Sequence, residues 1–384
     1  MGERAARVDA ALKVALVHPK FDRSGGAEVY ASGLAEGLAA AGHEVHLFAR
    51  RAEGLRGGLA LHRVPALPLG RAFKTYSFNA VSCLMLRATA FDVVQGFGKT
   101  TCQTVHRTGG GVHRAFLERQ GGRSRSLYDR VAIAIEDRLF ASATLRAVIC
   151  PSRWVAREVE GFYPGSASRI RVIPNGVDTA RFSPEGRDGD RRALFDRLQI
   201  PSASPALLFV GTNFPLKGLD VAVDALAHLP AAHLIVAGGD HPGPFESRAG
   251  AAGMAGRVHF LGAVRDPAPL YRAADILLHP TRYDPFANVC LEAWACGTPF
   301  VTTDGNGASD LLEGEKGGIA VPVSAGPEAF GAAVKSILGR GEECHSEARS
   351  LALAHDQARH LEQVLAVYAQ AAGARSADFI LPPK

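Results

Sequence analysis

The 384-residue sequence has no apolar run of about eighteen residues and no pair of cysteines spaced as CxxC. The first absence predicts no transmembrane helix, and the apolar part of "MGERAARVDAALKVALVHP" is too short for a signal peptide. The second absence makes a disulfide framework or a zinc site unexpected, so we expect ordinary buried thiols in a cytoplasmic protein. The cysteines are Cys83, Cys102, Cys150, Cys290, Cys296 and Cys344.

Charge is distributed unevenly along the chain. Residues 1–178 carry 25 Lys and Arg against 15 Asp and Glu, whereas the remaining residues carry 18 against 23. The basic half includes the string "RSRSLYDR", with Arg123 and Arg125. Solvated surface charge is one interpretation, and attraction to an anionic membrane face or an anionic acceptor is the other. Nucleic acid is not expected as a partner, because no recognition motif accompanies the charge.

Strand-like and helix-like stretches alternate through the sequence. "KVALVHP", "GGAEVYASGLAEGLAAAG" and "HEVHLFAR" predict a strand, a helix and a parallel strand, and "FDVVQGFG", "TCQTVH" and "LRAVICPS" are further strand candidates. A second series follows the loop "PNGVDTARFSPEGRDGDRR" and includes "ALLFVGT", "HLIVAGG", "VHFLGAV", "ADILLHP" and "PFVTTDG". The two series predict an α/β protein of two doubly wound domains, with a last amphipathic helical pattern from about Glu347 to Ala372.

The loops after the strands are where such sheets bind ligands. Gly25 and Gly26 precede a helix, so its N-terminus can face an anion, although a tight turn is the alternative. In the second series, Lys217 stands just before a glycine and a helix, which suits a diphosphate, and Thr212 and Asn213 are further hydrogen-bond donors there. Neither loop has a P-loop pattern, so an NTPase is not expected.

Two acids, Asp284 and Glu292, flank seven residues in "TRYDPFANVCLEAWACGTPFVTT". Asp284 and Pro285 resemble a helix N-cap followed by Pro at the first helical position, which places Glu292 about two turns into a helix that ends near Gly297. We expect the two carboxylates to reach one ligand, from the loop and from the helix. The alternatives are a simple cap for Asp284 and a structural carboxylate for Glu292.

A DxD string, Asp188-Gly189-Asp190, lies in the charged stretch "RDGDRR". Such a string can hold a divalent metal where it lies at the end of a strand. Here it lies outside the strand-end loops, so we interpret it as solvated charge in a linker and expect no metal there.

Several motifs in combination resemble the retaining nucleotide-sugar glycosyltransferases of family four, over nearly the whole chain. They are the paired acids, "VGTNFPLKG", "RVIPNGVDTARFSP" and "VHFLGAVRDPAPLYRAADILLHP". "RYDPFANVCLEAWACGTPFVTT" and "GFGKTTCQTVHRTGGGVHRAFLERQ" look most like the lipopolysaccharide core α-glucosyltransferases. The resemblance implies the GT-B fold, with two Rossmann-like doubly wound domains facing across a cleft. Residues 1–178 would bind the acceptor, with a C-terminal helix at 355–384 packing back on them, and residues 179–354 would bind the nucleotide-sugar.

The resemblance also implies roles for individual residues. Glu292 would bind the ribose hydroxyls of the donor, and Lys217 would neutralise the diphosphate beside Thr212 and Asn213. Gly25 and Gly26 would approach the diphosphate from the N-terminal domain. The residues lining the transferred sugar and its phosphate, through hydroxyl contacts and backbone amides, would be Asp284, Pro285, Phe286, Ala287 and Asn288.

Catalysis near the acceptor is assigned through the family's strand-end histidine. His106 in "QTVHRTGGGVHR" matches it, His113 is the second choice, and Asp284 is the third catalytic candidate. For either histidine, an imidazole satisfied in loop packing is the alternative. The sequence departs from the family pattern in having Asp284 where Glu is usual, Thr212 and Asn213 where an Arg is usual, and Gly110 where the closest relatives carry Asp.

The resemblance thus implies a retaining hexosyltransferase that moves a hexose onto a glycan or lipopolysaccharide-core acceptor. It favours glucose from UDP-glucose as the donor and leaves UDP-GlcNAc and GDP-mannose open. Lys217 and helix dipoles would serve the diphosphate, so neither a metal nor another cofactor is expected. The partners would be a nucleotide-sugar, a glycan or lipid-linked glycan, and an anionic membrane surface on the inner face of the cell membrane. The alternatives are a sugar-nucleotide-binding subunit with weak or no transferase activity, and a nucleotide-sugar epimerase on the same fold.

Overall fold

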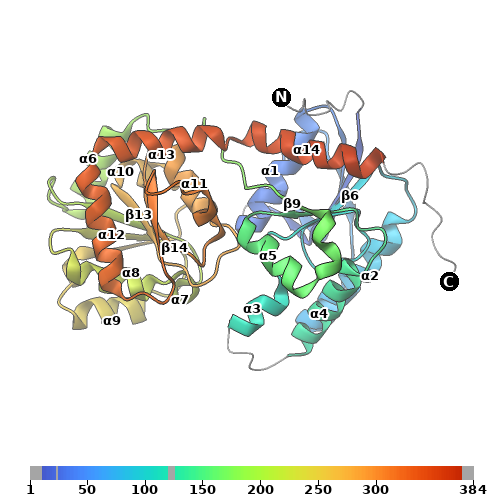
Figure 1. The fold of residues 1–384 in the computed structure, drawn as a ribbon, viewed down its shortest axis with the longest axis horizontal. Coiled ribbons are helices and arrows are strands. Elements are labelled where there is room, and N and C mark those ends of the chain that lie inside the picture. The colour runs from blue at the N-terminus through green and yellow to red at the C-terminus, as the bar shows by residue number, and fades with distance from the viewer. Residues whose placement is uncertain (1–10, 23–24, 120–125, 374–384) are drawn as a thin grey trace. The chain divides into compact units, whose positions relative to one another are not determined.

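The computed structural model describes residues 11–22, 25–119 and 126–373. The chain divides into two compact units, one of residues 1–174 with 358–384 and the other of residues 175–357. The sequence predicted boundaries at residues 178 and 354, a few residues away. Each unit is an α/β domain with a parallel sheet, which confirms the fold class expected from the alternation of strands and helices (Figure 1).

In the first unit, the described residues form a seven-stranded parallel sheet with the order β5-β3-β1-β6-β7-β8-β9. Its strands are β1 (Lys13–Val17), β3 (Glu44–Ala49), β5 (Ala60–Arg63), β6 (Val93–Gly96), β7 (Val105–Arg107), β8 (Ala147–Cys150) and β9 (Ile170–Val172), and two short strands, β2 (Lys20–Phe21) and β4 (Arg51–Ala52), pair separately. Its helices are α1 (Gly26–Ala40), α2 (Gly70–Leu86), α3 (His113–Arg119), α4 (Leu127–Phe140), α5 (Arg153–Phe162) and α14 (Gln357–Gly373).

Helices cover both faces of this sheet because the strand side chains are apolar on both sides. Val14 and Leu16 of β1 pack toward α1 and α14, whereas Ala15 and Val17 face a second cluster that includes Phe78 of α2. Residues 355–384 were expected to pack on the N-terminal domain. The helix α14 runs along the first unit (Figure 1), and its Tyr368 lies within that unit's core.

In the second unit, the described residues form a six-stranded parallel sheet with the order β12-β11-β10-β13-β14-β15. Its strands are β10 (Ala206–Val210), β11 (His233–Ala237), β12 (Val258–Gly262), β13 (Ile276–His279), β14 (Phe300–Thr303) and β15 (Gly318–Val321). Its helices are α6 (Arg187–Leu198), α7 (Phe214–Lys217), α8 (Leu219–Ala225), α9 (Gly243–Ala251), α10 (Ala268–Ala273), α11 (Asn288–Ala295), α12 (Pro327–Arg340) and α13 (Glu342–Ala354).

Alternate residues of these strands also feed two apolar clusters, one on each face. Leu208 and Leu277 pack toward α6, α10, α11 and α13, and Leu207 and Leu278 pack toward α8, α9 and α12. The sheet is therefore buried on both faces, and a ligand can reach polar side chains of the sheet only at the ends of the strands. None of the described helices is long and apolar enough to span a bilayer.

Two segments differ from the expectation. The last helical pattern is broken into α13 and α14, because the His355 carbonyl and the Gln357 amide hydrogen-bond the backbone of Val177 instead of continuing the helix. The supposed charged linker is the first turn of α6, where Asp190 accepts a hydrogen bond of 2.5 Å from Arg272. Asp190 is thus an ion-pair partner, whereas Asp188 is exposed.

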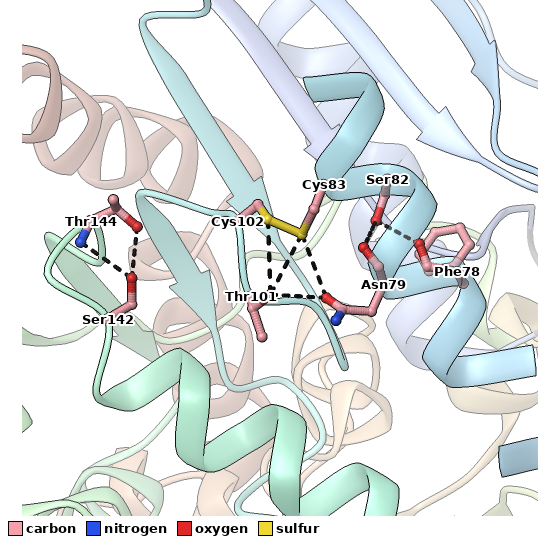
Figure 2. The surroundings of a disulfide bond; sticks show 8 residues. All are labelled: Phe78, Asn79, Ser82, Cys83, Thr101, Cys102, Ser142 and Thr144. Atoms are coloured by element: carbon pink, nitrogen blue, oxygen red, sulfur yellow. Dashed lines mark hydrogen bonds between the residues drawn. A yellow bond between two sulfur atoms is a disulfide. The ribbon is translucent and has the colours of Figure 1, made fainter. Parts of the chain in front are cut away.

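Cys83 of α2 and Cys102 of the loop between β6 and β7 form a disulfide (Figure 2). This corrects the expectation of six free thiols, although the other four cysteines are free and buried. The two residues lie 19 positions apart in the sequence, and the fold brings their Cα atoms to 5.4 Å, within the range that a disulfide needs. The sequence argument for a reducing compartment therefore loses one of its grounds.

Reduction of this disulfide should destabilise the first unit. A crosslink closing a loop of this length contributes about 2–4 kcal/mol, mainly by restricting the unfolded chain. We expect a dithiol reductant to lower the unfolding midpoint of the wild type, followed by circular dichroism in urea. The double variant Cys83→Ser/Cys102→Ser should unfold at the lower midpoint without reductant, and the reductant should not change that midpoint. Identical wild-type curves with and without reductant would contradict the crosslink.

Candidate active site

The second unit has a topological switch point between β10 and β13. From β10 the chain moves outward to β11 and β12, then returns to β13 and continues to β14 and β15 on the other side. In open parallel sheets, ligands bind beyond the carboxyl ends of the strands at such a point. The loops after β10 and β13 meet there, and they carry Lys217 and Asp284.

Three polar side chains converge at this point. The Lys217 ammonium donates to Asp284 Oδ2 at 2.5 Å, and Nε2 of His279, the last residue of β13, lies 3.7 Å from the same oxygen. Burial opposes ionisation of Asp284, but the Lys217 charge and His279 outweigh it and hold the pKa of that carboxyl below its usual range. Burial lowers the pKa of His279 and Lys217 adds to that effect; together they outweigh Asp284, which raises it, so the imidazole is neutral near pH 7.

A close approach of the two loops creates this ion pair. Gly218, with φ +75°, separates α7 from α8, and a Cβ there would lie 2.0 Å from the Pro280 carbonyl oxygen. The Arg282 amide donates to the Leu216 carbonyl at 2.9 Å, and its guanidinium bonds both carboxylate oxygens of Asp220. The backbone on both sides of Lys217 is therefore held by the Pro280–Arg282 segment, and its ammonium lies beside Asp284.

The segment after Asp284 is not the helix N-cap that the sequence predicted. The helix α11 begins at Asn288, with Ala287 as its N-cap residue, so Asp284 lies before it and Glu292 is about one turn in. Asp284 instead pairs with Asn306: its amide donates to Gly305 O, its carbonyl accepts from Gly307 N, and its Oδ1 accepts from the Phe286 amide. The loop departs from helical geometry because its hydrogen bonds go to the loop after β14.

Asn306 organises the start of α11. Its Oδ1 accepts from the amides of Ala287 and Ala308 at 3.1 and 3.0 Å. Two amides that the sequence assigned to the donor, those of Phe286 and Ala287, are therefore used within the protein. Asn288 Oδ1 accepts from the Asn175 side chain. The side chain of Phe286 is buried in the core, and Pro285 is half-buried.

Glu292 projects from the first turns of α11 toward Tyr271 of α10. The Tyr271 hydroxyl donates to Glu292 Oε2 at 2.7 Å. Burial raises the pKa of Glu292, and the Tyr271 hydroxyl and Arg181 offset part of that effect. The buried Tyr271 hydroxyl thus holds the carboxylate in one orientation. In that orientation Glu292 can accept a hydrogen bond from a neutral group of a ligand.

Thr212 and Asn213 lie in the loop between β10 and α7, and both are exposed. Asn213 has φ 59° and precedes α7, and its carbonyl accepts from the Lys217 amide. The structure thus brings the predicted Thr212, Asn213, Lys217 and Asp284 to one switch point, with Glu292 on the helix that follows Asp284.

In the first unit, Gly25 is the extended N-cap residue of α1 and Gly26 is its first helical residue. A Cβ on Gly25 would lie 2.7 Å from Glu28 Oε2, so a carboxylate occupies the space beside this helix start. The acid is favoured there by the helix dipole, and an incoming anion would have to displace it.

The two candidate histidines have different surroundings. His106 lies in β7, is buried, and forms a hydrogen bond of 3.2 Å with Gln103; burial and the Lys99 charge lower its pKa to about 3. His113 begins α3, its Nε2 lies 3.0 Å from Asp129 Oδ1, and its amide donates to Glu136. Both imidazoles therefore have protein partners in this structure.

Sequence reasoning missed three residues that shape the switch point, namely Tyr271, His279 and Asn306. His279 was visible in principle, because it is the last residue of a strand whose loop had been singled out. Tyr271 and Asn306 act through partners far away in sequence, and no local pattern marks such contacts.

Two family models match the chain. One described as Glycosyltransferase Family 4 matches residues 24–181, and one described as Glycosyl transferases group 1 matches residues 204–340. The chain is 30% identical, over an alignment of 412 residues, to a D-inositol 3-phosphate glycosyltransferase of Xylanimonas cellulosilytica, with 94% of this chain and 95% of that protein covered. A protein of the same name from Geodermatophilus obscurus is 31% identical over 271 residues, which cover 66% of this chain and 57% of that protein.

Solved structures of glycosyltransferases resemble the whole fold. WaaG, a glycosyltransferase involved in lipopolysaccharide biosynthesis, superposes with a TM-score of 0.78 at 23% identity, covering 95% of this chain and 100% of that one. Anabaena HepE in complex with UDP-glucose gives a TM-score of 0.73 at 18% identity, covering 94% and 100%. At these identities the likeness shows the fold, which is GT-B as the sequence predicted.

The close approach at Gly218 should make that glycine hard to replace. Gly218→Ala adds a Cβ against the Pro280 carbonyl, in a backbone conformation that alanine already disfavours. Gly253 has a similar φ of +69° but open space around it, so Gly253→Ala measures the conformational strain alone. We expect Gly218→Ala to lose about 1–3 kcal/mol more unfolding free energy in urea than Gly253→Ala. Equal losses would show that the two loops do not touch as described.

Proposed function

The chain belongs to glycosyltransferase family 4, and from that premise we propose that it transfers a hexose from a nucleoside diphosphate to a glycan acceptor with retention at the anomeric carbon. The observation that carries the proposal is the Lys217–Asp284 pair at the sheet switch point, with Glu292 held on the next helix. A cation and two carboxylates match a ligand with an anionic centre and hydroxyl groups at both ends.

In the proposed donor complex, Glu292 accepts hydrogen bonds from the ribose hydroxyls and Lys217 pairs with the diphosphate. Asp284 accepts from hydroxyls of the transferred sugar. No metal or other cofactor takes part, because Lys217 and the amides at the start of α8 serve the diphosphate charge. From the first unit, the start of α1 at Gly25 and Gly26 contributes to the diphosphate once the Glu28 carboxylate moves aside.

The reaction breaks the bond between the anomeric carbon and the diphosphate oxygen, and it forms a bond from that carbon to an acceptor hydroxyl oxygen. Negative charge grows on the departing diphosphate, and the Lys217 ammonium stabilises that charge more than it stabilises the ground state. The acceptor attacks from the face that the diphosphate leaves, and its proton passes to the diphosphate. His106 faces the acceptor as a neutral hydrogen-bonding group, with His113 as the second candidate for that place.

The proposed donor is UDP-glucose and the proposed acceptor is a lipopolysaccharide-core or other lipid-linked glycan. The sequence resemblance to lipopolysaccharide core α-glucosyltransferases supports both. A second acceptor class is supported by the Xylanimonas relative, whose name specifies D-inositol 3-phosphate. Labelled UDP-glucose offered with each acceptor in parallel distinguishes them by which product carries the label.

The first unit also has a surface suited to an anionic membrane. Leu69, Phe73 and Tyr76, at the start of and along α2, and Leu127 of α4 are each at least half exposed, and we call them the α2–α4 face. The helix α2 has no acidic residue and carries Arg71 and Lys74, which are exposed. A cavity of about 410 Å³ opens between α2 and α4, lined by Tyr76, Asn79, Leu127, Arg130, Val131, Ala134, Ile135 and Arg138.

Exposed apolar side chains flanked by basic ones match the boundary between headgroups and acyl chains. We therefore place the membrane contact on the α2–α4 face. Arg123 and Arg125, which the sequence suggested for this contact, lie outside the described residues.

Donor binding should stabilise the protein against heat through Glu292. A nucleotide-sugar at one hundred times its dissociation constant adds about 2.7 kcal/mol to the unfolding free energy, a shift of several degrees. In a thermal-shift panel of UDP, GDP, ADP and TDP with their sugars, we expect the UDP forms to act and EDTA to change nothing.

The matched variants for this panel are two glutamates of the same unit. Glu292→Ala should lose the shift, and Glu342→Ala, an exposed residue at the start of α13, should keep it. If no nucleotide shifted the wild type, the proposed donor site would be wrong.

Membrane binding should depend on the α2–α4 face. Phe73→Glu removes an apolar contact and adds a negative charge, so we expect at least a tenfold weaker association with vesicles containing anionic lipid, or about 1.4 kcal/mol or more. Leu353→Glu is the control, because Leu353 of α13 is equally exposed at 50% but lies in the other unit. Sedimentation with sucrose-loaded vesicles measures both. Equal weakening by the two variants would place the contact elsewhere.

A further inference from the structure

His279 is a buried side chain without a hydrogen bond. Its exposure is 1%, and among the described residues neither ring nitrogen has a hydrogen-bond partner. Its own backbone is well tied, since the carbonyl accepts from Thr302 Oγ1 and from the Thr281 amide. A buried imidazole left without partners loses the hydrogen bonds it made to water, at a cost of about 1–3 kcal/mol. Such a group is expected where a second arrangement of the site supplies the partner.

The nearest acceptor is Asp284, and Lys217 currently holds it. Lys217 Nζ lies 2.5 Å from Asp284 Oδ2, and His279 Nε2 lies 3.7 Å from that same atom, just beyond hydrogen-bond range. Asp284 Oδ1 is already engaged by the Phe286 amide. A single carboxylate oxygen therefore stands between two donors, and the shorter contact belongs to the lysine.

Donor binding changes this competition. The proposed function, on which this inference rests, requires the Lys217 ammonium to pair with a diphosphate, which bears more negative charge than the Asp284 carboxylate. As Lys217 turns toward the diphosphate, Asp284 Oδ2 loses its short contact while the carboxylate stays mostly buried, with 14% of its side chain exposed. His279, at the end of the strand that leads into the Asp284 loop, is then the adjacent donor, through its Nε2.

We propose that His279 is a positioning residue that takes over Asp284 Oδ2 when the donor diphosphate takes Lys217, and that the imidazole gains a proton in doing so. Asp284 then keeps one orientation toward the transferred sugar in both states of the site. The proton that His279 gains also offsets part of the negative charge that the diphosphate brings into the site.

The charged and titratable groups around His279 determine the direction of the proton movement. Lys217 of α7 and Asp284 of the following loop are the charged ones, and the Cys290 thiol of α11, near Asp284, stays protonated because burial raises its pKa. In the unliganded site, burial and Lys217 lower the pKa of His279. A bound diphosphate screens Lys217 and adds negative charge, so it raises that pKa. The extra affinity is therefore complete below the pKa of His279 in the unliganded site, falls as the pH rises from that pKa to the pKa of the liganded site, and is lost above it.

The test is isothermal titration of the intact protein with UDP-glucose at pH 7 in PIPES and in Tris, whose heats of ionisation differ. The sugar nucleotide has no group that titrates near pH 7, so any buffer-dependent heat reports protons taken up by the protein. We expect uptake of a fraction of one proton up to about one, and an affinity that falls with pH by at most about tenfold per unit.

Three variants assign the proton. His279→Gln keeps an amide donor but cannot titrate, so it should bind UDP-glucose without proton uptake and with a flat pH profile. His279→Leu removes the donor as well and should bind about tenfold or more weakly, which His279→Gln largely restores. His259→Gln, whose imidazole pairs with His233 among the strands of the same sheet, should keep the uptake of the wild type.

The outcomes distinguish a failure of the role proposed for His279 from a failure of the proposed donor binding. Proton uptake that disappears in His279→Gln and persists in His259→Gln supports the exchange. Binding without uptake in the wild type, or uptake that survives in His279→Gln, overturns the role of His279 and leaves donor binding intact. No binding of UDP-glucose, UDP-GlcNAc or GDP-mannose overturns both proposals.

Discussion

The Lys217–Asp284 ion pair exists because two loops of the second unit touch at Gly218 and Pro280. A side chain at Gly218 would occupy the position of the Pro280 carbonyl, so the loops after β10 and β13 can meet only through a glycine. The Arg282 contacts with Leu216 and Asp220 then fix their register. The chemistry of the site follows from this backbone contact, because it brings a cation from one side of the switch point onto a carboxylate from the other.

This arrangement gives the site an internal charge balance before any ligand arrives. A lone buried lysine or aspartate at a strand end would be costly, whereas the pair neutralises itself within hydrogen-bond distance. An anionic ligand that pairs with Lys217 must therefore displace Asp284 from it. The resemblance described from the sequence implied an additional arginine near this lysine, and Thr212 and Asn213 stand in that place. In the proposed donor complex a single cation would serve both Asp284 and the diphosphate, so Asp284 would need a neighbouring donor such as the His279 imidazole.

The sequence predicted most of the architecture because its strands are buried on both faces. Strands such as β1, β10 and β11 consist of unbroken apolar runs, which a parallel sheet requires and which few other structures tolerate. The edge strands β5, β9 and β15 were missed. The first two are mostly exposed or half-buried and carry no such run, and β15 is a strand of four residues that begins at a glycine. The break between α13 and α14 was also invisible, because it depends on Val177, which is remote in sequence.

In the candidate site too, local patterns identified individual residues but not the contacts between them. Lys217, Asp284 and Glu292 could be chosen because each lies at a fixed offset from a strand end or a helix start. The pairing of Lys217 with Asp284 could not, since it depends on the closeness of two loops that are 67 residues apart. The disulfide between Cys83 and Cys102 was not predicted for a similar reason, because a spacing of 19 residues matches no recurrent disulfide framework. Patterns locate chemical groups along the chain, and only packing decides which groups meet.

The first unit carries a constraint on how the chain completes its fold. Its core includes Val364, Val367 and Tyr368 of α14, and the Tyr368 hydroxyl donates to Gln95 Oε1 at 2.8 Å in that interior. His360 of the same helix bonds the Tyr30 hydroxyl. The second unit is one continuous stretch, residues 175–357, whereas the first needs residues from both ends. The second unit can therefore bury its core without residues from the first, although it is made later than most of the first. The apolar face of the first unit that α14 covers stays open until α14, which is made after the whole second unit, packs on it.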